Sequence, residues 1–114
     1  MILSLVFFSC NTGNLEVLAD IDSSLEEVSA IAITNNSSLY WVIEDSGNSN
    51  KLYALNRKGN IEKTIAITNA KNNDWEDLAT DSNGNIYIGD FGNNNHKRKE
   101  FNIYKISNSE LAKD

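Results

Sequence analysis

The chain has 114 residues, with 16 acidic and 10 basic side chains and a formal net charge of −6. This charge argues against non-specific binding to nucleic acid or anionic lipid headgroups, because both need a positively charged protein surface. We therefore expect no nucleic-acid partner. The length suits one small domain, and the 40% hydrophobic content predicts a folded core rather than disorder.

The first ten residues end in a small residue and the only cysteine of the chain. An apolar run from Ile2 to Phe8 precedes Ser9 and Cys10, and polar residues follow. This order resembles the end of a bacterial lipoprotein signal peptide, and the run is too short to span a bilayer. The resemblance implies a signal peptide at 1–10, a lipid anchor on Cys10 and attachment to the bacterial cell envelope. The alternative is a first strand with Cys10 buried in the core.

From residue 14 onward the sequence predicts short β-strands separated by turns, and no helix. Apolar runs rich in β-branched and aromatic residues favour strands, and the Asn, Asp and Gly residues between them favour turns. We predict hairpin turns at 56–60, where Gly59 takes a positive φ, and at 81–84. Residues 108–114 are predicted to be a polar tail. The predicted strands are 15–21, 29–34, 38–43, 51–55, 61–67, 75–80, 85–89 and 101–106.

Two similar hexamers, D-S-G-N-S-N at 45–50 and D-F-G-N-N-N at 90–95, indicate an internal repeat with a period in the mid-forties. Four short strands per period of this length are typical of β-propeller blades. We therefore predict an all-β fold, a partial β-propeller over residues 14–107 with roughly two four-stranded antiparallel blades. Because propellers typically have about four to eight blades, we expect either the N-terminal part of a longer protein or assembly with copies of itself.

The segments D-W-E-D-L-A at 74–79 and I-Y-I-G-D-F-G-N at 86–93 carry a family resemblance. They resemble bacterial secreted six-bladed β-propellers of the SdiA-regulated and NHL-like families. The resemblance implies a propeller fold, and the first functional hypothesis is a ligand- or partner-binding module at the cell surface. The alternative is a metal-assisted hydrolase of ester, lactone or phosphoester type, because propellers carry both kinds of function.

Carboxylates at the ends of the predicted inner strands suggest a metal site. The loop entering the first strand of a blade and the loop leaving the second lie on the same face, so their acidic residues are expected to converge at the mouth of the channel. Carboxylate oxygens are the ligands that Ca²⁺ prefers, and such an ion would polarise a carbonyl or phosphoryl group. The predicted metal ligands are Glu76, Asp77, Asp90 and Asp45.

The repeated D-x-G-N segments also have a structural interpretation. Asp45 and Asp90 would accept hydrogen bonds from backbone N–H groups two residues further on, and the glycines would supply a positive φ. A role in turns recurs in every blade, whereas a catalytic site is single, so the repetition favours the turns. Glu76 and Asp77 occur only in the second copy and stay candidates for a functional site. The predicted turn residues are Gly47, Asn48, Gly92 and Asn93.

Overall fold

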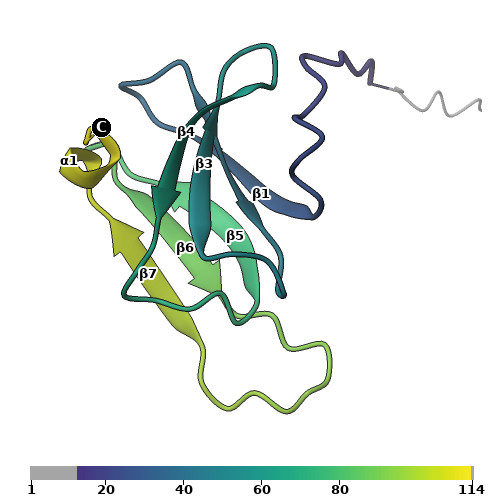
Figure 1. Ribbon diagram of the computed structural model, residues 1–114, viewed down its shortest axis with the longest axis vertical. Coiled ribbons are helices and arrows are strands. Elements are labelled where there is room, and N and C mark those ends of the chain that lie inside the picture. The colour runs from purple at the N-terminus through teal and green to yellow at the C-terminus, as the bar shows by residue number, and fades with distance from the viewer. Residues whose placement is uncertain (1–12, 114) are drawn as a thin grey trace, which may run out of the picture.

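A computed structural model describes residues 13–113, in which seven strands form two antiparallel sheets (Figure 1). The first sheet has the order β1 (Val28–Ile33), β2 (Tyr40–Glu44), β3 (Lys51–Leu55) and β4 (Ile61–Ala66). The second has the order β5 (Trp75–Thr80), β6 (Ile86–Asp90) and β7 (Asn102–Ile106), and helix α1 (Asn108–Leu111) follows it. The predicted all-β class is therefore confirmed, with strand ends that differ from the prediction by up to two residues.

The burial pattern explains the place of each strand in the first sheet. β2 and β3 are almost completely buried and form its centre. β4 alternates between half-buried and exposed residues, as expected for an edge strand with one solvated face. Gly59, in the turn between β3 and β4, has a φ of +85°, which confirms the predicted hairpin there.

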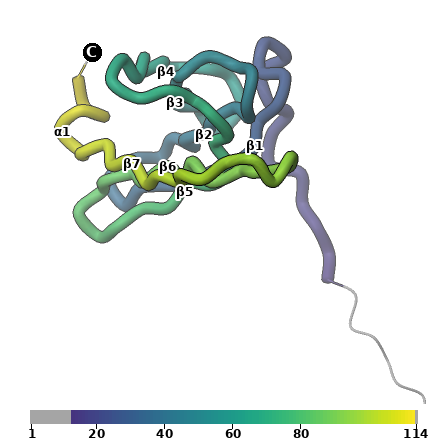
Figure 2. Tube along the Cα trace, turned by 90° about the horizontal axis from the view of Figure 1, so that it is seen from below, coloured from purple at the N-terminus to yellow at the C-terminus, as the bar shows by residue number. Residues whose placement is uncertain are grey.

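The two sheets pack face to face, and Figure 2 shows β5, β6 and β7 as a layer beneath β1–β4. The first strands of the sheets lie next to each other: the Ser29 hydroxyl donates to the Trp75 carbonyl at 2.8 Å, and the Thr80 hydroxyl donates to the Ile33 carbonyl at 3.3 Å. One core fills the space between the sheets, so the indole rings of both sheets lie inside it. Its buried members are Ala32, Trp41, Ile43, Leu52, Ala54, Trp75, Leu78, Ile86, Ile88, Ile106 and Leu111.

The predicted strand at 15–21 is not formed. Leu15 is fully exposed and Val17 is 82% exposed, and no strand pairs with this segment among the described residues. Its apolar residues do not alternate strictly, and an isolated strand without a partner is not stable. The residues that follow cover the other face of the first sheet, where Leu25 packs against the cluster of Val42, Tyr53 and Leu55.

The predicted polar tail contains a short helix, so the expectation of no helix is wrong. Ser107 caps α1, because its hydroxyl accepts the Glu110 backbone N–H at 3.3 Å, and Leu111 is buried in the core. In residues 13–113 no helix is long and apolar enough to cross a membrane. Cys10 and the predicted signal peptide at 1–10 lie outside the described residues.

Candidate functional site

Three carboxylates from the two sheets meet at one end of the molecule. Asp45 follows β2, Asp74 precedes β5, and Glu76 lies within β5. Each offers one oxygen, and these oxygens lie within 4.8 Å of one another. The structure thus brings together two of the four predicted metal ligands and adds Asp74, which the sequence analysis did not select.

An irregularity in β5 places Glu76 in this cluster. Trp75 pairs with Asp90 and Asp77 with Gly89, so one extra residue lies between the two pairs. With strict alternation Trp75 and Leu78 would point to opposite faces, yet both belong to the core between the sheets. This β-bulge turns Glu76 toward the first sheet and leaves Asp77 outside the cluster, exposed.

Asp90 has a different environment from the one expected. It is fully buried, and one of its carboxylate oxygens accepts the Asp74 backbone N–H at 3.0 Å and the Arg98 guanidinium at 2.9 Å. The counterpart of Asp90 in the first sheet is Glu44 rather than Asp45. Glu44 and Asp90 are each the last residue of the second strand of their sheet, and each pairs with the start of the first strand. Glu44 is also buried and accepts the Glu26 backbone N–H at 3.0 Å. Both carboxylates therefore hold the chain that enters the first strand of their sheet.

The first D-x-G-N segment forms a turn, although its hydrogen bonds differ from the prediction. The Asp45 carboxylate accepts the backbone N–H of the next residue, Ser46, at 2.5 Å. Gly47 has the predicted positive φ, at +86°. The Asn48 side chain donates to the Glu27 carboxylate at 3.0 Å and ties this turn to the chain entering β1.

The second D-x-G-N segment is built differently. Gly92 is not among the glycines with a positive φ, so that expectation fails there. A Cβ atom at Gly92 would lie 2.1 Å from the carboxyl carbon of Asp74, and this close approach is what requires glycine. Asn93 accepts the Arg98 backbone N–H at 2.9 Å and so closes the loop after β6.

Asn72 connects the two loops that carry the cluster, and the sequence analysis missed it. Its side-chain NH₂ donates to the backbone carbonyls of Glu44 at 2.9 Å and Asp45 at 3.0 Å. Its side-chain oxygen accepts the backbone N–H of Trp75 at 3.0 Å. Asn72 is only 5% exposed. It stands among other polar loop residues in the sequence, and only the buried position distinguishes it.

The electrostatics of the cluster disfavour three ionised carboxylates. Burial raises the pKa of Asp74, the adjacent Asp45 carboxyl group raises it further, and the charge of Arg98 offsets part of the effect. Burial and then the charges of Asp74 and Asp45 raise the pKa of Glu76. Asp74 is 7% exposed, and its Oδ1 has no hydrogen-bond partner among the described residues. The cluster is therefore suited to a cation.

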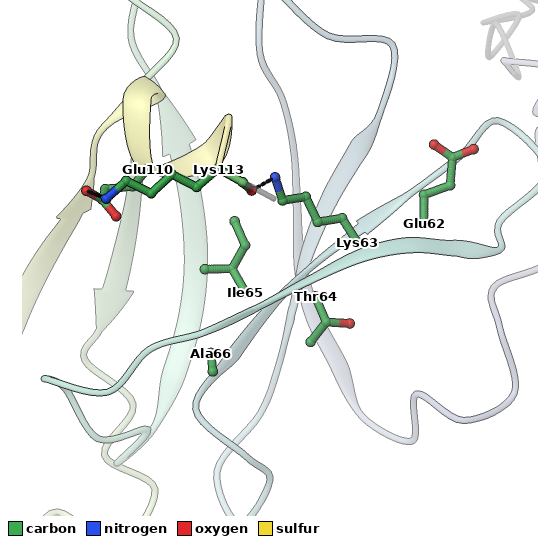
Figure 3. Close-up of a pocket in the computed structure, with 7 residues that line it drawn as sticks. All are labelled: Glu62, Lys63, Thr64, Ile65, Ala66, Glu110 and Lys113. Atoms are coloured by element: carbon green, nitrogen blue, oxygen red, sulfur yellow. Dashed lines mark hydrogen bonds and ion pairs between the residues drawn. The ribbon is translucent and has the colours of Figure 1, made fainter.

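A larger groove of about 530 Å³ lies elsewhere, between β4 and α1 (Figure 3). There the Lys63 ammonium donates to the carbonyls of Leu111, at 2.8 Å, and Lys113. Lys113 also forms an ion pair with Glu110 at 2.5 Å. These polar groups bind one another and thereby join the edge of the first sheet to the helix. We therefore regard the carboxylate cluster, rather than this groove, as the candidate functional site.

Comparisons with known proteins do not assign the chain to a family. No family model, curated protein or solved structure matches it. The resemblance of residues 74–79 and 86–93 to secreted propellers stays a prediction.

Proposed function

We propose that this chain supplies two adjoining sheets of a β-propeller that acts as a ligand- or partner-binding module on the bacterial cell envelope. One observation carries the proposal: the free face of the sheet β5–β7 occupies the register positions that the first sheet buries in the core, and large apolar side chains lie exposed on it. A face of this kind is suited to packing against a further sheet.

The match follows from the pairing registers. Tyr53 and Tyr104 occupy the same position in the third strand of their sheets, so the preceding residues, Leu52 and Ile103, correspond as well. Leu52 is fully buried between the sheets, whereas Ile103 is 74% exposed. The same β-bulge in β1 and β5 further supports two sheets of one kind.

Other large apolar side chains extend the free face. Phe101 is 51% exposed and Phe91 is 45% exposed. The Phe91 ring covers Gly89, since a Cβ atom there would lie 2.0 Å from the ring. We propose that the occupant of this face is another antiparallel sheet of the same kind. In a preparation of this chain alone, that sheet belongs to a second copy.

The first ten residues support the proposed location at the cell envelope. The apolar run before Ser9 and Cys10 supports a lipid anchor on Cys10. Such an anchor would hold the sheets at the outer side of a bacterial membrane, where a propeller ring serves as a scaffold for binding. One acyl chain alone gives weak membrane binding, so stable attachment needs more than one.

Light scattering of the purified chain at increasing concentration tests the proposed packing. We expect reversible self-association of the wild type, and a monomer for Ile103→Lys, because the lysine replaces an apolar side chain that is 74% exposed on this face with a charge. Val17→Lys is the matched control, since Val17 is 82% exposed but lies outside this face, and it should associate like the wild type. A wild type that stays monomeric at every concentration would contradict the proposal.

A further inference from the structure

We propose that Asp45, Asp74 and Glu76 form a Ca²⁺ site that ties the two sheets together. The site is separate from the apolar face described above, and it joins a loop of the first sheet to the first strand of the second. Its role is to hold the sheets in a fixed relation at the end where their inner strands meet.

The spacing of the carboxylates suits a single Ca²⁺ ion. Ca²⁺ binds oxygen at about 2.3–2.6 Å, so two oxygens on the same ion lie at most about 5 Å apart. One oxygen from each of the three carboxylates falls within 4.8 Å of the other two. The three groups therefore reach one ion with little change in the backbone.

The buried Asp74 carboxylate lacks a partner that an ion would supply. Asp74 is 7% exposed, and its Oδ1 is shielded from solvent without a hydrogen bond within the described part of the chain. A buried carboxylate without a partner is costly, which indicates a missing positive ligand. Arg98 is already engaged, since its guanidinium donates to the Asp90 carboxylate and the Gly92 carbonyl, both at 2.9 Å.

The surroundings hold the three ligands in place. Asn72 binds the backbone carbonyl of Asp45, and the Asp74 backbone N–H is bound to Asp90. Gly92 lies so close that its missing side chain leaves room for the Asp74 carboxylate. A cavity of about 290 Å³ lies beside Asp74, and Lys97 and Arg98 are also among its lining residues.

The chemistry of the donors selects the metal. All three ligands are hard carboxylate oxygens, which suit Ca²⁺ or Mg²⁺ rather than zinc or copper. Mg²⁺ demands a nearly ideal octahedron and keeps most of its water, whereas Ca²⁺ accepts an irregular set of six to eight oxygens. Three carboxylates from separate loops and a strand form such an irregular set, so we expect Ca²⁺ to be preferred.

Isothermal titration of the full chain with CaCl₂, after removal of metal with a chelator, tests the site. We expect saturable binding of one ion per chain, with a dissociation constant on the order of 10⁻⁴ M, as in extracellular calcium modules. Glu76→Gln and Asp45→Asn should each weaken binding at least tenfold, and both residues are half-buried rather than part of the core. Asp77→Asn is the matched control, because Asp77 is the next residue in β5 and lies outside the cluster.

The results separate this proposal from its alternatives. Absence of saturable binding, or equal loss of affinity in Asp77→Asn and Glu76→Gln, would overturn it, since the second result would indicate general attraction to an acidic surface. Preference for Mg²⁺ would overturn the choice of metal. Ile103→Lys should bind Ca²⁺ like the wild type, so failure of the proposed sheet packing and failure of the Ca²⁺ site are distinguishable.

Discussion

The side-chain amide of Asn72 donates to the backbone carbonyl of Asp45 at 3.0 Å and so connects the loop after β2 with the loop before β5. The same amide binds the Glu44 carbonyl, and its oxygen accepts the N–H of Trp75. Because Asp45 belongs to the first sheet and Glu76 to the second, these bonds set the distance between the carboxylates. One buried amide thus links the packing of the sheets to the geometry of the site.

Replacing Asn72 with alanine should therefore affect both stability and the site. The change leaves the buried Trp75 backbone N–H without its acceptor and removes one donor from the carbonyls of Glu44 and Asp45, which should lower the free energy of unfolding by about 1–3 kcal/mol. Ca²⁺ affinity should fall as well, because Asp45 loses its fixed position. Urea unfolding and calorimetry measure the two effects. Asn73→Ala is the control, since Asn73 is exposed and its amide makes one long contact of 3.4 Å with Asp90.

Two glycine substitutions should have different consequences. Gly92→Ala places a methyl group against the Asp74 carboxyl group and should displace it, so we expect a strong loss of Ca²⁺ affinity. Gly47 has a φ of +86° and open space around its Cβ position, so Gly47→Ala should cost only backbone strain, about 1–2 kcal/mol. Titration calorimetry of both variants is the measurement. Equal affinities in the two variants would argue against a steric role for Gly92.

The Arg98–Asp90 ion pair should stabilise the folded protein at the loop after β6. Asp90 is fully buried and the Arg98 side chain is 21% exposed, with 2.9 Å between the charged atoms. Arg98→Ala leaves the buried Asp90 carboxylate without a charged partner and should cost about 3–5 kcal/mol in unfolding free energy. Arg98→Lys keeps the charge but loses the second donor, so an intermediate loss is expected in the same denaturant experiment. A loss below 1 kcal/mol in the alanine variant would show that this ion pair does not stabilise the fold.

The strands were predictable because their signals are local. The segments at 51–55 and 75–80 have the β-branched, aromatic and apolar residues of buried strands, and the structure has β3 and β5 at these positions. Gly59 marked a tight turn in the same way. The segment at 15–21 shares the composition, but a strand also needs a partner, and pairing is a property of the whole fold.

The sequence contains a local signal for the start of the C-terminal helix. Ser107 followed three residues later by Glu110 is the sequence pattern of a capping box at the start of a helix. Leu111 then supplies the apolar side chain that binds this helix to the core. Residues 108–114 are mostly polar and so predict a tail, whereas the burial of Leu111 depends on the packing of the whole fold.

The site was predicted only in part, because it depends on register. Alignment of the two hexamers made Asp45 equivalent to Asp90, whereas the ladders match Asp90 with Glu44. The shift by one residue comes from the loops, which differ between the sheets. The bulge in β5 is equally invisible in the sequence, yet it decides that Glu76 joins the cluster and Asp77 does not.

The proposed lipid anchor predicts a change of compartment on mutation. When the full chain is expressed in a bacterium, the wild type should sediment with membranes and incorporate a labelled fatty acid. Cys10→Ser removes the only thiol, so the label should be lost. Ser9→Ala keeps a small residue before the cysteine and should behave like the wild type. Labelling that persists in Cys10→Ser would show that the fatty acid is attached elsewhere.

Asp81 should make stability depend on pH in the acidic range. Its carboxylate accepts hydrogen bonds from the Asn85 amide at 2.8 Å, the Asn85 backbone N–H, the Tyr87 hydroxyl and the Asn83 backbone N–H. These bonds, the one from the Asn85 amide above all, lower the pKa of Asp81 from 3.8 to about 2. The folded state therefore favours the ionised form more than the unfolded state does.

The sign of the effect follows from this difference. An acid with a lower pKa in the folded state contributes stability that is fully present above pH 3.8 and is lost as the pH falls through about 2. Asp81→Asn removes that contribution, so its Tm should lie below that of the wild type at pH 7, and the gap should close between about pH 4 and pH 2. Thermal unfolding across this range measures the gap. A gap that stays constant at low pH would mean that the shape of the side chain, rather than its charge, stabilises the turn.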